Sequence, residues 1–134
     1  MMTINNFISA TFLIVLTLNS CNFSDSTESL GDEYYYRNEG ESVKDILCQK
    51  ANGGEIPATV MSFDFNDEFI IAKQIPKLPQ DPMYDNDYKY NNGNKEYYYW
   101  IIIKESNLVL GPLSLEEFKN QKNKYNIPDN LRLK

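Results

Sequence analysis

The sequence contains no histidine among its 134 residues. Histidine is the commonest general base in enzymes and the commonest protein ligand of transition metals, so its absence removes the usual centre of a catalytic triad or a zinc site. The chain also lacks the Gly-x-Ser-x-Gly and Ser-x-x-Lys patterns of hydrolases and any glycine-rich loop that could hold phosphate. We therefore expect a protein that is not an enzyme, with no catalytic residue, no metal site and no cofactor.

Without histidine, paired carboxylates are the next candidates for acid–base chemistry. Glu116 and Glu117 are explained by a helix start, where the helix dipole stabilises acidic side chains. Asp85-Asn86-Asp87 begins like a calcium loop, but Lys89 and Tyr90 stand where such a loop needs its third ligand and its glycine. A carboxylate-based enzyme is the less favoured alternative.

Positive charge is scarce as well. The chain has 13 Lys and Arg against 19 Asp and Glu, and its formal net charge is −6. Binding of nucleic acid rests on Lys and Arg that neutralise phosphates, so no nucleic-acid partner is expected. Charge alone would not hold this protein at an anionic membrane surface either.

Charged residues are missing altogether before Asp25. The apolar run at residues 7–18 is too short to cross a bilayer, which takes about 20 residues, but it has the length of a signal-peptide core. It ends at Leu18-Asn19-Ser20-Cys21, which resembles the lipobox of bacterial lipoproteins. Signal peptides normally begin with basic residues, but residues 1–6 contain no Lys or Arg. An uncleaved membrane anchor and a buried core helix are therefore the alternatives.

The lipobox resemblance implies a signal peptide at residues 1–20 and acyl chains such as palmitate on Cys21. The protein is then expected to be lipid-anchored on the extracytoplasmic side of the cell membrane or the outer membrane. Lipidation of Cys21 leaves Cys48 without a cysteine partner, and Cys48 is expected to be a small buried apolar residue. Residues 21–32 are polar and predict a flexible tether, followed by a single globular domain at 33–134.

Strand signals dominate this domain. Residues 34–36 and 43–48 flank Gly40, which can take a positive φ, and predict a hairpin. Further strands are expected at 59–65, 68–74, 97–103 and 108–110, with 97–103 central because both of its faces are apolar. Within 59–65 the alternation predicts one buried face, made of Thr59, Met61, Phe63 and Phe65.

A single helix is expected near the C-terminus. Ser114 and Glu117 have the spacing of a capping box, which predicts a helix from Leu115 to about Lys124. Leu131 and Leu133 beyond it could pair at a sheet edge. The predicted fold class is therefore α+β, a small antiparallel sheet of about six strands with one C-terminal helix packed on it.

The long connection at residues 77–95 breaks the strand pattern and is expected to be either functional or disordered. Tyrosines are concentrated in and after it. Exposed aromatic side chains can bind peptides or sugars, whereas tyrosine also fits half-buried strands. A possible binding surface for an envelope protein or glycan partner consists of Trp100, Tyr98, Tyr90 and Tyr88.

Five short motifs occur in a fixed order along most of the chain after Cys21. They are Gly31-Asp-x-Tyr-Tyr-Tyr36, Ile56-Pro57, Phe69-Ile-Ile-Ala-Lys73, Tyr99-Trp-Ile-Ile102 and Gly111-Pro-Leu-Ser-x-x-Glu-Phe118. This ordered set resembles a family of short bacterial lipoproteins of uncharacterised function. The resemblance implies a secreted, lipid-anchored domain and brings no catalytic residues.

A second, local resemblance covers Trp100 and the segment from Gly111 to Phe118. It is similar to the opening of GYF-type domains, which bind proline-rich peptides in an aromatic groove. This resemblance implies a peptide- or glycan-binding module as the alternative to a non-enzymatic lipoprotein with a binding or structural role. The later elements of GYF-type domains have no counterpart before Lys134.

Overall fold

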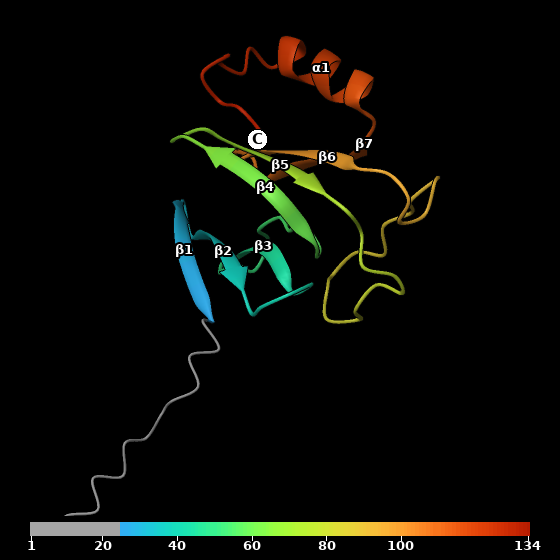
Figure 1. The fold of residues 1–134 in the computed structure, drawn as a ribbon. Helices are drawn as coiled ribbons and strands as arrows, with labels where there is room; N and C mark the ends of the chain where they lie inside the picture. The colour runs from blue at the N-terminus through green and yellow to red at the C-terminus, as the bar shows by residue number, and fades with distance from the viewer. Residues whose placement is uncertain (1–24) are drawn as a thin grey trace, which may run out of the picture.

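Two antiparallel sheets and one helix lie in three layers in the computed structural model, which describes residues 25–134 (Figure 1). The first sheet contains β1 (Ser26–Gly31), β2 (Tyr34–Asn38) and β3 (Lys44–Cys48). The second contains β4 (Val60–Phe65), β5 (Phe69–Gln74), β6 (Tyr98–Ile103) and β7 (Leu108–Leu113), and α1 (Leu115–Lys124) covers its outer face.

The antiparallel pairing and the C-terminal helix agree with the predicted fold class, but the number and grouping of strands do not. Seven strands form two sheets instead of about six in one. The reason is the segment 49–59, which leaves β3 and crosses to the second sheet. It also covers the open edge of β3, since Ile56 and Ile46 exchange backbone hydrogen bonds of 2.8 and 3.0 Å.

The N-terminal strand also differs from expectation. Residues 21–32 are not a flexible tether throughout: Ser26–Gly31, within this predicted tether, pair along β2 in antiparallel register. Strand pairing uses backbone groups, so a polar segment can pair when it buries one anchoring side chain. Leu30 supplies that anchor and is fully buried. The expected signal peptide at 1–20, Cys21 and the first residues of the expected tether lie outside the described residues.

A β-bulge changes which side chains of β4 face inward. Val60 pairs with Gln74 and Ser62 with Lys73, so Met61 is the extra residue. Phe63 packs inward as expected, but Met61 is 52% exposed while Val60 is buried. The alternation of inward-facing and outward-facing side chains along β4 is therefore interrupted at Met61.

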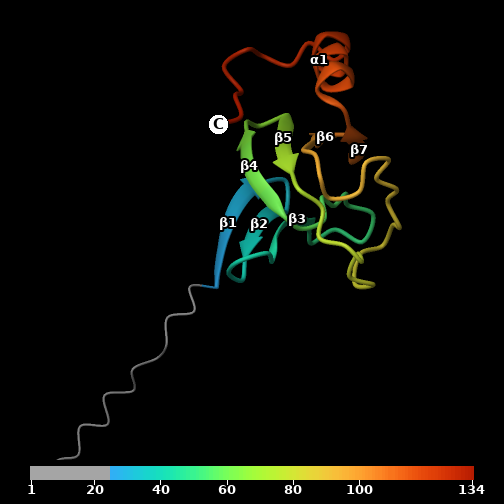
Figure 2. The same ribbon diagram turned by 45° about the vertical axis from the view of Figure 1, so that its right-hand side comes forward.

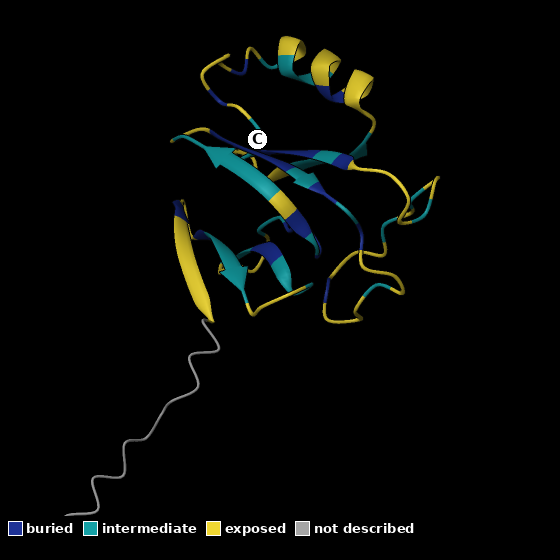
Figure 3. Cartoon of the chain, viewed as in Figure 1, coloured by how far each residue is buried: buried dark blue, intermediate teal, exposed yellow. Residues whose placement is uncertain are grey.

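Strand β6 lies between β5 and β7, which confirms its predicted central place. Trp100 and Ile102 enter the core between the two sheets, and Ile101 enters the core between the second sheet and α1. We call these the inter-sheet core and the helix-side core. Figure 3 shows that β5 and β6 consist mostly of buried residues, whereas the outer side of α1 is exposed.

Helix α1 begins and ends where the capping pattern predicts. The Ser114 hydroxyl accepts a hydrogen bond of 3.1 Å from the Glu117 amide, and Phe118 is buried against the sheet. Strand β7 is longer than expected, because a bulge lets it continue past Gly111 and Pro112 to Leu113. Proline has no amide hydrogen to donate, and this edge strand does not need one there.

The tail after α1 forms no strand. It returns from the helix layer toward β4 (Figure 2), where the Arg132 amide donates to Asp64 at 2.9 Å and the Ser62 hydroxyl to the Lys134 carbonyl at 3.3 Å. Leu131 is buried in the helix-side core. The expected edge pairing of Leu131 and Leu133 is therefore replaced by side-chain hydrogen bonds and apolar packing. Within residues 25–134, no helix is long and apolar enough to cross a membrane.

Candidate functional site

The aromatic residues expected to form a binding surface lie inside the domain. Trp100 is fully buried and Tyr98 is 7% exposed. Tyr88 and Tyr90 are half-buried; Tyr88 meets Trp100 edge-on at 4.9 Å between ring centroids, and Tyr90 meets Tyr98 at 5.0 Å. Trp100 and Tyr98 therefore cannot form an exposed surface, because the connection between β5 and β6 lies over them. The aromatic groove implied by the resemblance to GYF-type domains would need an accessible tryptophan, and Trp100 is buried.

That connection, residues 75–97, is held to the inter-sheet core by polar contacts. The Tyr90 hydroxyl accepts a hydrogen bond of 3.0 Å from Gln74, and the Glu55 carboxylate accepts from the amides of Asp85 and Asn86 at 2.8 and 3.3 Å. Burial of Tyr88 and Tyr90 explains why the sequence is rich in tyrosine here. The segment is a structural cover for the inter-sheet core.

Alkaline pH is expected to weaken this cover. Burial raises the pKa of Tyr88 and of Tyr90 from 10.0 to about 12. The folded state thus favours the neutral phenols, and the stability they contribute is complete below pH 10 and is lost as the pH rises through about 12. Tyr88→Phe should move the alkaline unfolding midpoint to higher pH, measured by circular dichroism. An unchanged midpoint would show that this phenol has no raised pKa.

Asp45 is a fully buried carboxylate whose partners are all structural. It accepts from Arg37 through both oxygens, at 3.0 and 2.6 Å, and from the Tyr84 hydroxyl at 2.6 Å. Burial and the hydrogen bond to Asp45 raise the pKa of Tyr84, so its proton stays in place. Both carboxylate oxygens are occupied, and Asp45 is unsuited to acid–base catalysis.

Lys104 is a buried ammonium without a carboxylate partner among the described residues. It donates to the backbone carbonyls of Leu30 and Asn66, and burial lowers its pKa. Leu30 belongs to β1 and Asn66 to the turn between β4 and β5. Lys104 therefore links the two sheets and is not accessible to a substrate.

The described part of the chain holds no group of three or more Cys, Asp or Glu placed to bind a metal ion. Cys48 is half-buried and packs against the inter-sheet core, with its sulfur 4.0 Å from the Asp32 carbonyl. Its packing against the core agrees with the apolar residue expected from the sequence, but Cys48 is half-buried and not fully buried as expected. Glu116 and Glu117 lie in the first turn of α1, as expected for a helix start.

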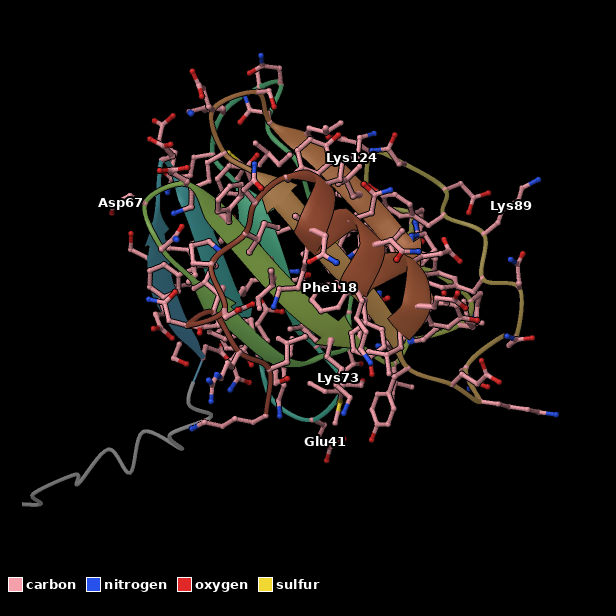
Figure 4. The ribbon with its side chains drawn as sticks, turned by 90° about the horizontal axis from the view of Figure 1, so that it is seen from above. Glu41, Asp67, Lys73, Lys89, Phe118 and Lys124 are labelled. Atoms are coloured by element: carbon pink, nitrogen blue, oxygen red, sulfur yellow. The ribbon has the colours of Figure 1, made fainter. Side chains whose placement is uncertain are left out.

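A surface groove lies where α1 and the tail meet the outer face of the second sheet. It has a volume of about 360 Å³, and we call it the α1 groove. Its apolar lining consists of Ile71, Tyr99, Leu115, Phe118, Leu131 and Leu133. Its charged lining consists of Lys73, Lys122, Arg132 and Lys134, with no acidic residue. Figure 4 shows this side of the molecule, with Phe118 between α1 and the sheet and Lys73 on the same face.

A second hollow of about 390 Å³ adjoins the α1 groove, and we call it the β4 hollow. The two hollows share Arg132 and Lys134. The β4 hollow is also lined by Tyr36, Met61 and Phe63, and Met61 reaches it because the bulge turns this side chain outward. Its single acidic residue, Asp64, accepts hydrogen bonds from the amides of Phe65 and Arg132.

The cations of the α1 groove have no ionic partner. Among residues 25–134 only Arg37 forms ion pairs, with Glu39 and Asp45, and residues 1–24 contain no Asp or Glu. Lys122 instead donates to the Leu131 carbonyl at 3.4 Å, and Lys73 lies 4.0 Å from the Tyr97 ring centroid. Four positive charges beside an apolar floor can attract an anionic group and hold apolar side chains next to it.

A shift in charge along the sequence points to this face, although no motif marks it. Residues 113–134 contain five Lys and Arg and three Asp and Glu, a net charge of +2. Residues 25–112 contain eight Lys and Arg and sixteen Asp and Glu, which gives a net charge of −8. The reversal of charge sign near the C-terminus is visible in the sequence, but the approach of Arg132 and Lys134 to β4 requires the fold.

Comparison with known proteins places the chain in a family of unknown function. A family model described as "Protein of unknown function (DUF3997)" matches residues 32–134. No curated protein and no solved structure matches the chain.

Proposed function

Because the chain belongs to the DUF3997 family, whose function is unknown, we propose a function from its own residues. The protein is a lipid-anchored, extracytoplasmic component of the cell envelope that acts by binding a partner and not by catalysis. The observation that carries the binding role is the α1 groove, where four cations that form no ion pair among residues 25–134 surround an apolar floor. The anchor rests on Cys21 at the end of its apolar run.

The position of β1 supports an orientation of the domain on the membrane. Five residue steps separate Cys21 from Ser26, where β1 begins, and a chain of that length reaches at most about 17 Å. The start of the first sheet at Ser26 therefore lies close to the lipid. Helix α1 lies on the far side of the second sheet (Figure 1), so the α1 groove would face away from the anchoring membrane.

Buried polar groups with structural partners support a non-catalytic role. The buried carboxylate of Asp45 and the buried ammonium of Lys104 each have their hydrogen-bonding atoms occupied by protein groups. Both lie away from the α1 groove, which contains lysines and arginine but no acid that could act as a general base there. A site of this composition can bind an anion.

Replacement of Cys21 tests the anchor. Cys21→Ser should abolish incorporation of labelled fatty acid, because serine offers no thiol for the thioether bond. Cys48→Ser is the matched control and should incorporate the label like the wild type. Metabolic labelling followed by membrane fractionation measures both variants. Labelled fatty acid on the Cys21→Ser protein would contradict the anchor, whereas its loss from Cys48→Ser would point to the wrong cysteine.

A further inference from the structure

The α1 groove and the β4 hollow form one path across the edge of the second sheet, with their two shared cations midway. Arg132 and Lys134 line both hollows, and apolar side chains lie on each side of them. We propose that this path binds an extended acidic peptide segment of a partner protein. Its carboxylates meet Arg132 and Lys134, and its apolar side chains enter the two hollows. This inference rests on the proposed binding function.

Charge complementarity argues for an acidic occupant. The Arg132 side chain donates from Nε to the Asp129 carbonyl at 3.1 Å, and its remaining guanidinium donors have no carboxylate within ion-pair distance among residues 25–134. A planar guanidinium is suited to a carboxylate, which it can bind through two parallel hydrogen bonds. The one carboxylate that lines the β4 hollow, that of Asp64, already accepts hydrogen bonds from two backbone amides.

The rest of the domain argues against a uniformly charged polymer. Residues 25–112 carry a net charge of −8 and would repel a long polyanion laid across the molecule. The favourable region is local, around the tail and α1. An occupant therefore needs a few acidic groups at one place and neutral groups elsewhere, which describes a peptide better than an anionic polymer.

The arrangement of apolar side chains argues against a single-chain lipid. A fatty acid has one apolar chain on one side of its carboxylate, but here apolar residues flank the shared cations on both sides. Met61 is 52% exposed in the β4 hollow and Leu115 is 47% exposed at the α1 groove. An extended peptide places side chains on both sides of an acidic residue and covers both.

Selection from a displayed library of random dodecapeptides tests the proposal. The target is the full-length lipidated protein in phosphatidylcholine nanodiscs, with empty nanodiscs for counter-selection. Enriched peptides should be acidic with apolar residues on both sides of the acid. In fluorescence anisotropy, Lys122→Gln/Arg132→Gln should weaken their binding by about tenfold or more, and replacement of peptide Asp and Glu by Asn and Gln should have a similar effect.

Lys89→Gln/Lys95→Gln is the matched control, since it removes two charges from exposed positions in segment 75–97. Lys89 points outward at the periphery of the molecule (Figure 4), and the control should change the affinity less than about twofold. Thermal unfolding checks that each variant is folded. If the groove variant unfolds, Lys134→Gln removes a shared cation at an exposed residue and replaces it in the test.

Vesicles of phosphatidylglycerol and phosphatidylcholine form a second arm. If no acidic peptide is enriched but the protein binds these vesicles through Lys122 and Arg132, the peptide proposal falls and the binding role of the groove stands. If neither probe binds, both the peptide proposal and the proposed binding function fall. Acidic peptides that bind the Lys122→Gln/Arg132→Gln protein as tightly as wild type would overturn the site.

Discussion

Trp100→Ala is expected to lower the free energy of unfolding by about 3–5 kcal/mol, the usual cost of removing a large buried aromatic side chain. Trp100 is the largest fully buried side chain of the described residues and lies in the inter-sheet core. Its indole nitrogen donates to Gln74 at 2.7 Å, and Gln74 in turn donates to the Pro57 carbonyl at 2.8 Å. Truncation therefore leaves a cavity and an unpaired acceptor at once.

The space around Trp100 cannot readily collapse to fill that cavity. A Cβ atom at Gly111 would overlap the six-membered ring of Trp100, so β7 lies directly against the indole. Tyr88 contacts it edge-on from segment 75–97. A cavity between two strands and a tethered loop keeps most of its volume, which places the expected loss in the upper part of the range for such substitutions.

Urea unfolding followed by far-ultraviolet circular dichroism measures this loss, because Trp100 is the only tryptophan and its fluorescence disappears with it. Tyr97→Ala is the matched control, an aromatic truncation three residues earlier. Tyr97 is 46% exposed and contacts Lys73, so its replacement should cost less than about 1 kcal/mol. Equal losses in the two variants would contradict the burial of Trp100.

Asp45→Ala is expected to cost about 3 kcal/mol or more, because removal of one partner from a buried ion pair leaves the other without compensation. Asp45 is fully buried, while the Arg37 side chain is 19% exposed and can still reach water in part. The loss should therefore lie toward the lower end of the range for buried pairs. Tyr84 also loses the acceptor of its hydroxyl proton.

The position of Asp45 makes this substitution affect more than one strand. Through Arg37 it ties β3 to β2, and through Tyr84 it ties the first sheet to segment 75–97. The Tyr84 hydroxyl also accepts the Ala58 amide at 3.0 Å. We expect the Ala58 amide to exchange its hydrogen faster in Asp45→Ala than in the wild type. The increase should be larger than the lower free energy of global unfolding alone would cause.

Glu39→Gln is the control for the Asp45 prediction. Glu39 contacts the same guanidinium at 3.4 Å, but its side chain is 44% exposed and solvent screens the pair. Its replacement should cost less than about 1 kcal/mol in the same urea titration. A Glu39→Gln loss as large as that of Asp45→Ala would show that burial does not set the strength of these two pairs.

Local sequence signals predicted the elements whose stability is local. Helix α1 follows from Ser114 and Glu117 because a capping box involves only neighbouring residues. The β2–β3 hairpin follows from its turn, where Gly40 takes a positive φ. The central place of β6 follows from apolar residues on both of its faces, since such a strand needs cover on each side.

The features that the sequence did not predict depend on distant partners. Strand β1 is polar and exists because β2 offers an open edge and the core accepts Leu30. The bulge at Met61 depends on the register against β5. The burial of Trp100 depends on segment 75–97, and the sequence does not tell whether this segment folds back over it.

The sequence by itself determined the charge balance, the absence of histidine, the β2–β3 hairpin, the central strand β6 and the helix with its cap, because composition and short-range geometry need no partner. It also supplied the prediction that Cys21 anchors the protein. Only the tertiary structure decided which side chains are accessible. It buried Trp100 and Tyr98 beneath a loop and brought Arg132 and Lys134 beside β4, because burial and the meeting of distant residues depend on how the layers pack.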